Sequence, residues 1–124
     1  MRWIMQQLEK QYDEFVTEFG KNLGKVDVSL GLQIMNLQRK FTDTTLKVEL
    51  RICYRPGTDL EKKQLELDNY FACISTTYVK KQHGIPDCED TLKVECMTDL
   101  DTVYKISKDP DVISIHGTAS LGSY

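Results

Sequence analysis

The sequence predicts a single α+β domain spanning residues 1–124, in which an N-terminal amphipathic helix packs on a mostly antiparallel sheet of four or five strands. Three observations predict this class. Residues 4–23 repeat apolar side chains at helical spacing, later segments alternate apolar and polar residues, and residues 92–115 follow a strand, helix, strand order. The 124 residues, 40% apolar and 28% charged, suit one ordinary globular domain.

The clearest expected element is a helix from Ile4 to Leu23. Its apolar side chains form one stripe: Ile4, Leu8, Tyr12, Phe15, Val16, Phe19 and Leu23. Gly24 is a natural C-terminal stop. A helix with one apolar face must cover apolar surface, so we expect it to pack on the sheet of its own domain. Pairing with a second copy or a partner protein is the alternative.

Two strands are expected next, over residues 26–34 and 46–54, because apolar residues alternate with polar ones in both. Leu37 breaks the alternation, which indicates a bulge or a strand end near Met35. Residues 42–44 resemble a turn, so the two strands are expected to form an antiparallel hairpin.

Residues 60–81 fit a helix and a strand almost equally well. The run from Tyr70 to Val79 is rich in aromatic and β-branched residues, so we expect a strand over residues 67–80. A polar loop with Gly84 and Pro86 follows over residues 82–90.

A compact β-α-β unit is expected at the C-terminal end. Leu92, Val94 and Cys96 alternate as a short strand, and Thr98 with an acid three residues later predicts a helix N-terminus. Pro110 ends that helix, and residues 112–115 form the last strand. This is half of the ferredoxin-like motif, a generic likeness from which no function follows.

Charge and composition exclude several classes of protein. The net charge of −3 argues against non-specific nucleic-acid binding, and no run approaches the ~20 apolar residues of a membrane span. The first residues turn polar at once, unlike a secretion signal. We therefore expect a cytoplasmic protein whose four cysteines are idle reduced thiols.

Metal and catalytic motifs are weak. His83, Cys88 and Cys96 lack the spacing and the fourth ligand of a zinc site, so neither metal nor cofactor is expected. Cys88 lies between acids that disfavour a thiolate, whereas Cys53 lies between Arg51 and Arg55 but has no histidine nearby in sequence. No catalytic residue is predicted.

Two groups of residues are candidates for binding an anionic ligand or a partner. Arg51 and Arg55 with Tyr54 offer ion pairing and stacking. His116, Thr118 and Ser120 follow the last strand in a segment rich in backbone donors and hydroxyls, which lacks the lysine of a phosphate-binding loop. A solvated strand face and a flexible terminus are the respective alternatives.

The leading hypothesis is a small non-enzymatic intracellular binding protein that acts through protein–protein contacts, of the inhibitor, immunity, antidefence or chaperone type. Its partner would be a protein or a second copy, bound on the free face or edge of the sheet, with no nucleic acid and no membrane. One alternative is a binder that sequesters an anionic metabolite or nucleotide signal. Another is a small hydrolytic enzyme that uses His83 or His116.

Overall fold

The computed structural model describes residues 2–42, 46–70, 73–79 and 90–121, with the backbone alone described for residues 73–79. Within these ranges the helices are α1 (Arg2–Leu23), α2 (Val28–Lys40), α3 (Leu60–Leu67) and α4 (Leu100–Ser107). The strands are β1 (Leu46–Tyr54), β2 (Cys73–Val79), β3 (Asp90–Met97) and β4 (Val112–Leu121). The α+β class, the N-terminal helix and the antiparallel sheet are confirmed.

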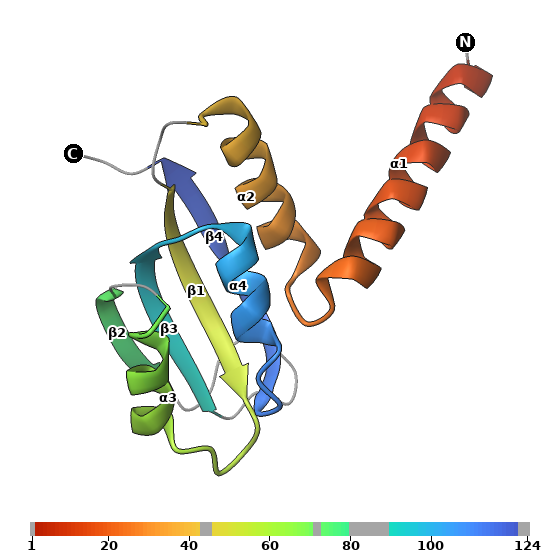
Figure 1. Cartoon of the computed structure of the whole chain (residues 1–124). Coiled ribbons are helices and arrows are strands. Elements are labelled where there is room, and N and C mark those ends of the chain that lie inside the picture. Colours follow the sequence, from red (N-terminus) through yellow and green to blue (C-terminus); the bar gives the residue numbers. More distant parts are fainter. Residues whose placement is uncertain (1, 43–45, 71–72, 80–89, 122–124) are drawn as a thin grey trace.

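The strands form one sheet in the order β2-β3-β1-β4, and every neighbouring pair is antiparallel. Helix α3 connects β1 to β2, and α4 connects β3 to β4 (Figure 1). This β-α-β-β-α-β connectivity and strand order are those of the ferredoxin-like arrangement. The expected C-terminal β-α-β unit is therefore one half of a complete split motif.

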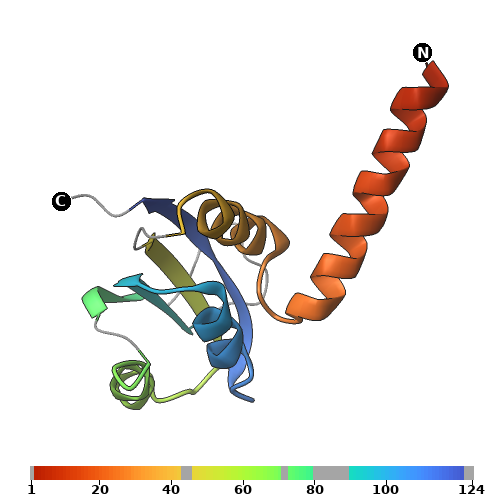
Figure 2. The same cartoon turned by 45° about the horizontal axis from the view of Figure 1, so that its top comes forward.

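The core lies between one face of the sheet and helices α2, α3 and α4 (Figures 1 and 2). Alternate residues of β1 and β3 point into it because side chains alternate across a strand. Leu50, Ile52 and Val94 are fully buried there against Leu30 of α2 and Val103 of α4. The free energy of folding is therefore concentrated on this face.

An aspartate begins each of the three helices that cover the sheet. Asp27 accepts a hydrogen bond from the backbone N–H of Leu30 at 3.2 Å, and Asp59 and Asp99 do the same for α3 and α4. A carboxylate here satisfies an orphan donor and complements the positive end of the helix. The cap of α4 is thus one residue later than the expected Thr98.

The expectation that the N-terminal helix packs on the sheet is wrong. Helix α1 contacts α2 near its own C-terminal end, where Phe19 and Leu23 lie against Gly31. Its N-terminal turns project away from the sheet (Figure 2). The physical reason is that α2, α3 and α4 already cover the apolar face.

The expected strand over residues 26–34, and with it the hairpin, is also wrong. Only Val26 makes a strand-like contact, a single parallel bridge to Ile115 of β4. Asp27 then caps α2, in which Leu30, Ile34 and Leu37 follow helical spacing. Leu37 breaks the alternation of a strand but fits the spacing of a helix, so it is the residue that distinguishes the two patterns here. The neighbours of β1 are β3 and β4 instead.

The ambiguous segment contains both kinds of element. Residues 60–67 form α3 and residues 73–79 form β2, so the expected strand over 67–80 is correct only in its later part; residue 80 lies outside the described ranges. Asp59 explains the helix, because its side chain caps the first turn. The run richest in β-branched residues does form the strand.

The last strand extends well beyond the expected residues 112–115. It continues to Leu121 and pairs with β1 along nearly its whole length, with a register shift between Cys53 and Tyr54. Gly117 permits this pairing: its φ is 155°, and a Cβ there would overlap the carbonyl oxygen of Glu49. The segment expected to be a flexible tail is strand as far as residue 121.

Candidate functional site: the open face of the sheet

The candidate site is the face of the sheet opposite the helices, which we call the open face. No described helix lies on it (Figure 1). The pairing register arranges the side chains of β3, β1 and β4 into rows across the sheet. From one end to the other these rows are Thr91–Cys53–Ser114, Lys93–Arg51–His116, Glu95–Glu49–Thr118 and Met97–Lys47–Ser120.

The row Lys93–Arg51–His116 gathers basic side chains from three neighbouring strands. Arg51 is in the middle, and its buried Nε atom has no hydrogen-bond partner among the described residues. The Nδ1 atom of His116 lies 3.9 Å from Oδ1 of Asp27. A buried guanidinium donor without an acceptor carries a desolvation cost.

The neighbouring acids are engaged with the lysines of this face. Lys93 lies 3.5 Å from Glu49, and Lys47 lies 3.9 Å from Glu95. These pairs are partly exposed, so each contributes little to stability. They do set the charge pattern of the open face. Each acid is paired with a lysine, so Arg51 remains as the cation at the centre.

The hollows lined by described residues lie mainly away from the open face, such as one of about 220 Å³ between α3 and α4 that Tyr54 and Tyr70 line. Met97 of the open face borders another, near Phe41 at the end of α2. Thr118 and Ser120 are exposed on the open face and add hydroxyl groups to it.

One end of the open face is buried. Thr91 and Cys53 are both inaccessible to solvent, and Cys53 is disulfide-bonded to a cysteine outside the described side chains. The expectation of idle reduced thiols is therefore wrong for Cys53. Cys96 is a buried thiol on the helix side, as its apolar neighbours predicted, and its Sγ donates to the carbonyl of Val48 at 3.6 Å.

The structure brings four of the six candidate binding residues together on the open face: Arg51, His116, Thr118 and Ser120. It separates the other two from them. Tyr54 lies on the opposite face in the core, and Arg55 follows the end of β1, where its backbone N–H donates to Asp111. The predicted grouping of Arg51 with Tyr54 is wrong because residues an odd number apart on a strand face opposite ways.

Sequence reasoning did not identify Lys93 as part of the site. The alternation in residues 92–96 indicated that Lys93 lies on a polar face, but the register that aligns it with Arg51 is a property of the folded sheet. His83 and Cys88 lie outside the described residues. No group of three or more metal-ligating side chains occurs among the residues that are described.

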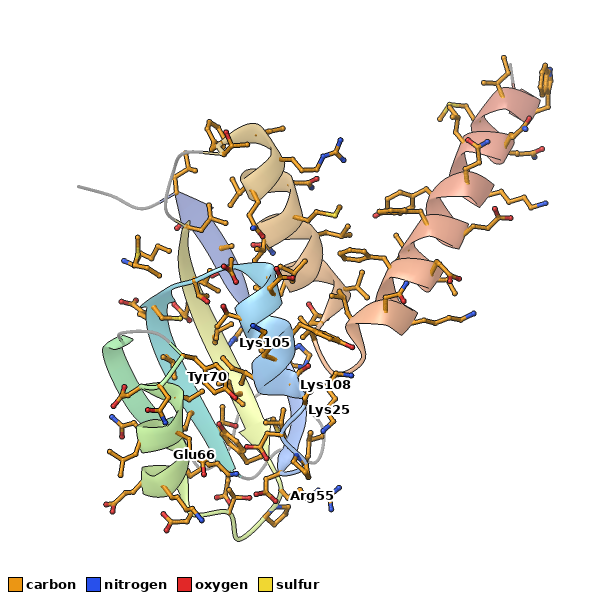
Figure 3. All side chains as sticks on the ribbon, in the orientation of Figure 1. Lys25, Arg55, Glu66, Tyr70, Lys105 and Lys108 are labelled. Carbon is orange, nitrogen blue, oxygen red and sulfur yellow. The ribbon has the colours of Figure 1, made fainter. Side chains whose placement is uncertain are left out.

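A second polar cluster lies on the helix side, centred on Lys63 of α3. Its ammonium group is 2.8 Å from Asp109, 2.9 Å from Asp111 and 3.5 Å from Glu66. Lys63 is only 9% exposed, and Lys25 donates to the backbone carbonyl of Asp109 at 3.0 Å. Figure 3 shows Glu66 on α3 and Lys25 across from it, below α4. The cluster ties α3 to the connection between α4 and β4.

The ionisation of this cluster is fixed at neutral pH. Burial alone would lower the pKa of Lys63, but hydrogen bonds to Asp109 and Asp111 outweigh it and raise that pKa. Burial, followed by the charge of Asp109, raises the pKa of Tyr54. Burial opposes ionisation of Asp109, yet the hydrogen bond from Lys63 lowers its pKa. None of these groups exchanges a proton readily near pH 7.

Within the described ranges, no helix is both long and apolar enough to cross a membrane. Comparison of the chain with protein-family models, with characterised proteins and with solved structures finds no match in any of the three.

Proposed function

We propose that this is a non-enzymatic binding protein that engages another protein through the open face of its sheet. The observation that carries the proposal is the row Lys93–Arg51–His116, which gathers basic side chains from three neighbouring strands. An acidic side chain of a partner would be complementary to this row. Inhibitor, immunity, antidefence and chaperone proteins all act by contacts of this kind.

The breadth of the face, four rows across three strands, favours a protein over a small molecule as its partner. Small ligands bind in concave sites that bury most of their surface, whereas protein interfaces are broad and shallow. Arginine is enriched among the residues that dominate interface energies, and a polar rim of hydroxyls is typical of transient complexes. The four rows provide such a surface around Arg51.

The Lys63 cluster offers no group suited to general acid–base catalysis. General acid–base catalysis works best with a pKa near the working pH. The pKa values of Lys63 and Tyr54 are raised far above neutrality, and that of Asp109 is lowered. These groups hold the fold together rather than transferring protons, which leaves the hydrolytic hypothesis without support from the Lys63 cluster.

The direct test is site-specific photo-crosslinking in the cells that produce the protein. A photoreactive residue at Thr118 on the open face should capture a partner protein, and the same residue at the exposed Glu61 of α3 should not. Arg51→Glu should abolish the Thr118 crosslink, while Arg55→Glu should leave it intact. Equal capture from both positions, or capture insensitive to Arg51→Glu, would reject the open face as the interface.

A second candidate function is the binding of a small anion at the same row, favoured by the three basic side chains that the sheet aligns there. Calorimetric titration with inorganic phosphate and with a nucleoside triphosphate tests it. Saturable binding that disappears in Arg51→Ala and persists in Lys105→Ala would support this candidate. The absence of heat from either titrant leaves the protein-binding proposal in place.

The cytoplasmic location expected from the sequence stays a proposal. Disulfides form and persist mainly in oxidising compartments, so the bond at Cys53 weighs against the cytoplasm. Fractionation of the producing cells, followed by detection of the protein in each compartment, decides between the two.

A further inference from the structure

Helix α1 carries an apolar stripe that is largely exposed. Tyr12 is 62% exposed and Leu8 is 53% exposed, although both are large side chains. The other exposed members are Ile4, Met5 and Phe15. In the part of the chain that the structure describes, the stripe lies against α2 at Phe19 and Leu23.

From these observations we propose that α1 pairs with α1 of a second copy of this chain, forming a symmetric dimer. This inference goes beyond the proposed function, because the stripe and the open face belong to different parts of the molecule. The pairing is antiparallel, so that each copy presents the same stripe to the other.

The size of the stripe matches the requirement for a dimer. Taking ~200 Å² for each large side chain, the exposed members leave roughly 500 Å² of largely apolar area in solvent. That is in the upper part of the ~300–600 Å² range of the largest patches on monomers. Two copies in contact would bury about 1,000 Å² of this apolar area alone, close to the ~1,000 Å² that a specific interface needs.

The exposed end of α2 offers a second surface for the incoming helix. Val28 and Gly31 contact α1, and helical spacing continues this side of α2 through Met35 to Arg39. Helical spacing places Glu9 and Glu18 at the two edges of the stripe of α1, whereas Lys10, Glu14 and Lys21 lie on its opposite face. The acidic border of the second α1 is thereby complementary to Arg39.

The same charge pattern argues against a lipid surface as the occupant. Helices that lie on anionic membranes carry mainly lysine and arginine on their polar faces. The polar face of α1 instead has more acids than bases among residues 3–23. Binding to a membrane is therefore the alternative that the experiments below distinguish from the dimer.

Sedimentation velocity of the full chain, from about 1 to 100 μM, tests the dimer directly. We expect a dimer that dissociates on dilution. Leu8→Glu combined with Tyr12→Glu should raise the dissociation constant at least ~100-fold, because two buried anchors become charged. The matched control, Gln6→Glu combined with Thr17→Glu, adds the same charge on the polar face and should leave the dimer intact.

Arg39→Glu should weaken the dimer by about tenfold, the effect of replacing an attractive interface charge by a repulsive one. Circular dichroism of each variant checks that helix content is retained. Wild-type protein that remains monomeric at about 100 μM would overturn the proposal. So would a dimer unchanged by the Leu8 and Tyr12 substitutions. Monomeric protein that binds phosphatidylcholine vesicles through the same residues would identify a membrane as the occupant, against the proposal.

Discussion

At the scale of single residues, Lys63 is the most heavily connected polar group described in the structure. It is nearly buried and contacts three carboxylates, two of them in the connection that follows α4. Its neighbour Lys62 is exposed. Substitutions at these two lysines therefore compare the stability contribution of internal ion pairs with that of an exposed charge.

Lys63→Met should lower the free energy of unfolding by about 2–3 kcal/mol, because partly buried Asp109 loses its hydrogen-bond donor. Lys62→Met should change it by less than ~0.5 kcal/mol. Urea denaturation of both variants and the wild type provides the comparison. Equal effects of the two substitutions would contradict the role assigned to Lys63.

The loss of stability in Lys63→Met should depend on pH, because the pKa values of Asp109 and Lys63 are both shifted in the fold. The pKa of Asp109 is lowered in the fold, so its stabilisation is present above the unfolded-state pKa near ~4 and is lost as pH falls. The pKa of Lys63 is raised, so its stabilisation is lost only as pH rises above ~10. The Lys63→Met penalty should therefore be greatest between about pH 5 and 10, and it should shrink below pH 4. A penalty constant down to about pH 2 would disprove the assignment.

Cys53 provides a chemical prediction at the same scale. Because it is disulfide-bonded, alkylation of the denatured, unreduced protein should leave Cys53 unmodified, while the Cys96 thiol reacts. Reduction before alkylation should add label at Cys53. Peptide mass mapping measures both states. Label at Cys53 without reduction, in protein prepared from its own compartment, would show that the bond is absent there.

At the scale of elements, the sequence predicted best where periodicity and composition agree. The N-terminal helix, β1, β3 and α4 were all expected near their observed positions. Residues 26–34 were mistaken for a strand because Val26, Val28, Leu30, Leu32 and Ile34 alternate, although Leu30 and Ile34 also suit a helix. The capping geometry of Asp27 decides between these patterns, and it exists only once the helix has formed.

The candidate site was only partly predictable for a related reason. Alternation along one strand indicates which residues share a face, and it identified Arg51 correctly as a polar-face residue. It does not give the strand order, which aligns Lys93 and His116 with Arg51 from segments distant in sequence. Gly117, which lets β4 approach β1, likewise lies in the segment for which a flexible terminus was one expectation.

Gly117→Ala tests the close approach of β4 to β1. The new methyl group would overlap the Glu49 carbonyl, and the φ of 155° is unfavourable for alanine. We expect a loss of at least ~3 kcal/mol in unfolding free energy. Gly24→Ala, at a turn with open space around it, should cost only about 1 kcal/mol. Similar thermal unfolding midpoints for the two variants would contradict the observed β4.

At the scale of the whole molecule, the helices divide the surface into regions with different roles. Three helices cover one face of the sheet and complete the core, which leaves the other face available for a partner. Helix α1 extends from this body with its apolar stripe exposed. The exposed part of the stripe, from Ile4 to Phe15, and the exposed residues of the open face lie outside the core, so both can serve as binding surfaces.

The most direct test of the central claim, that this chain acts by binding another protein, is a native mass spectrum of material purified gently from its own cells. We expect a complex heavier than the chain and its dimer by the mass of a partner protein, which dissociates when the same sample is denatured. Bare protein, or an added mass of small-molecule size that is lost on denaturation, would contradict it.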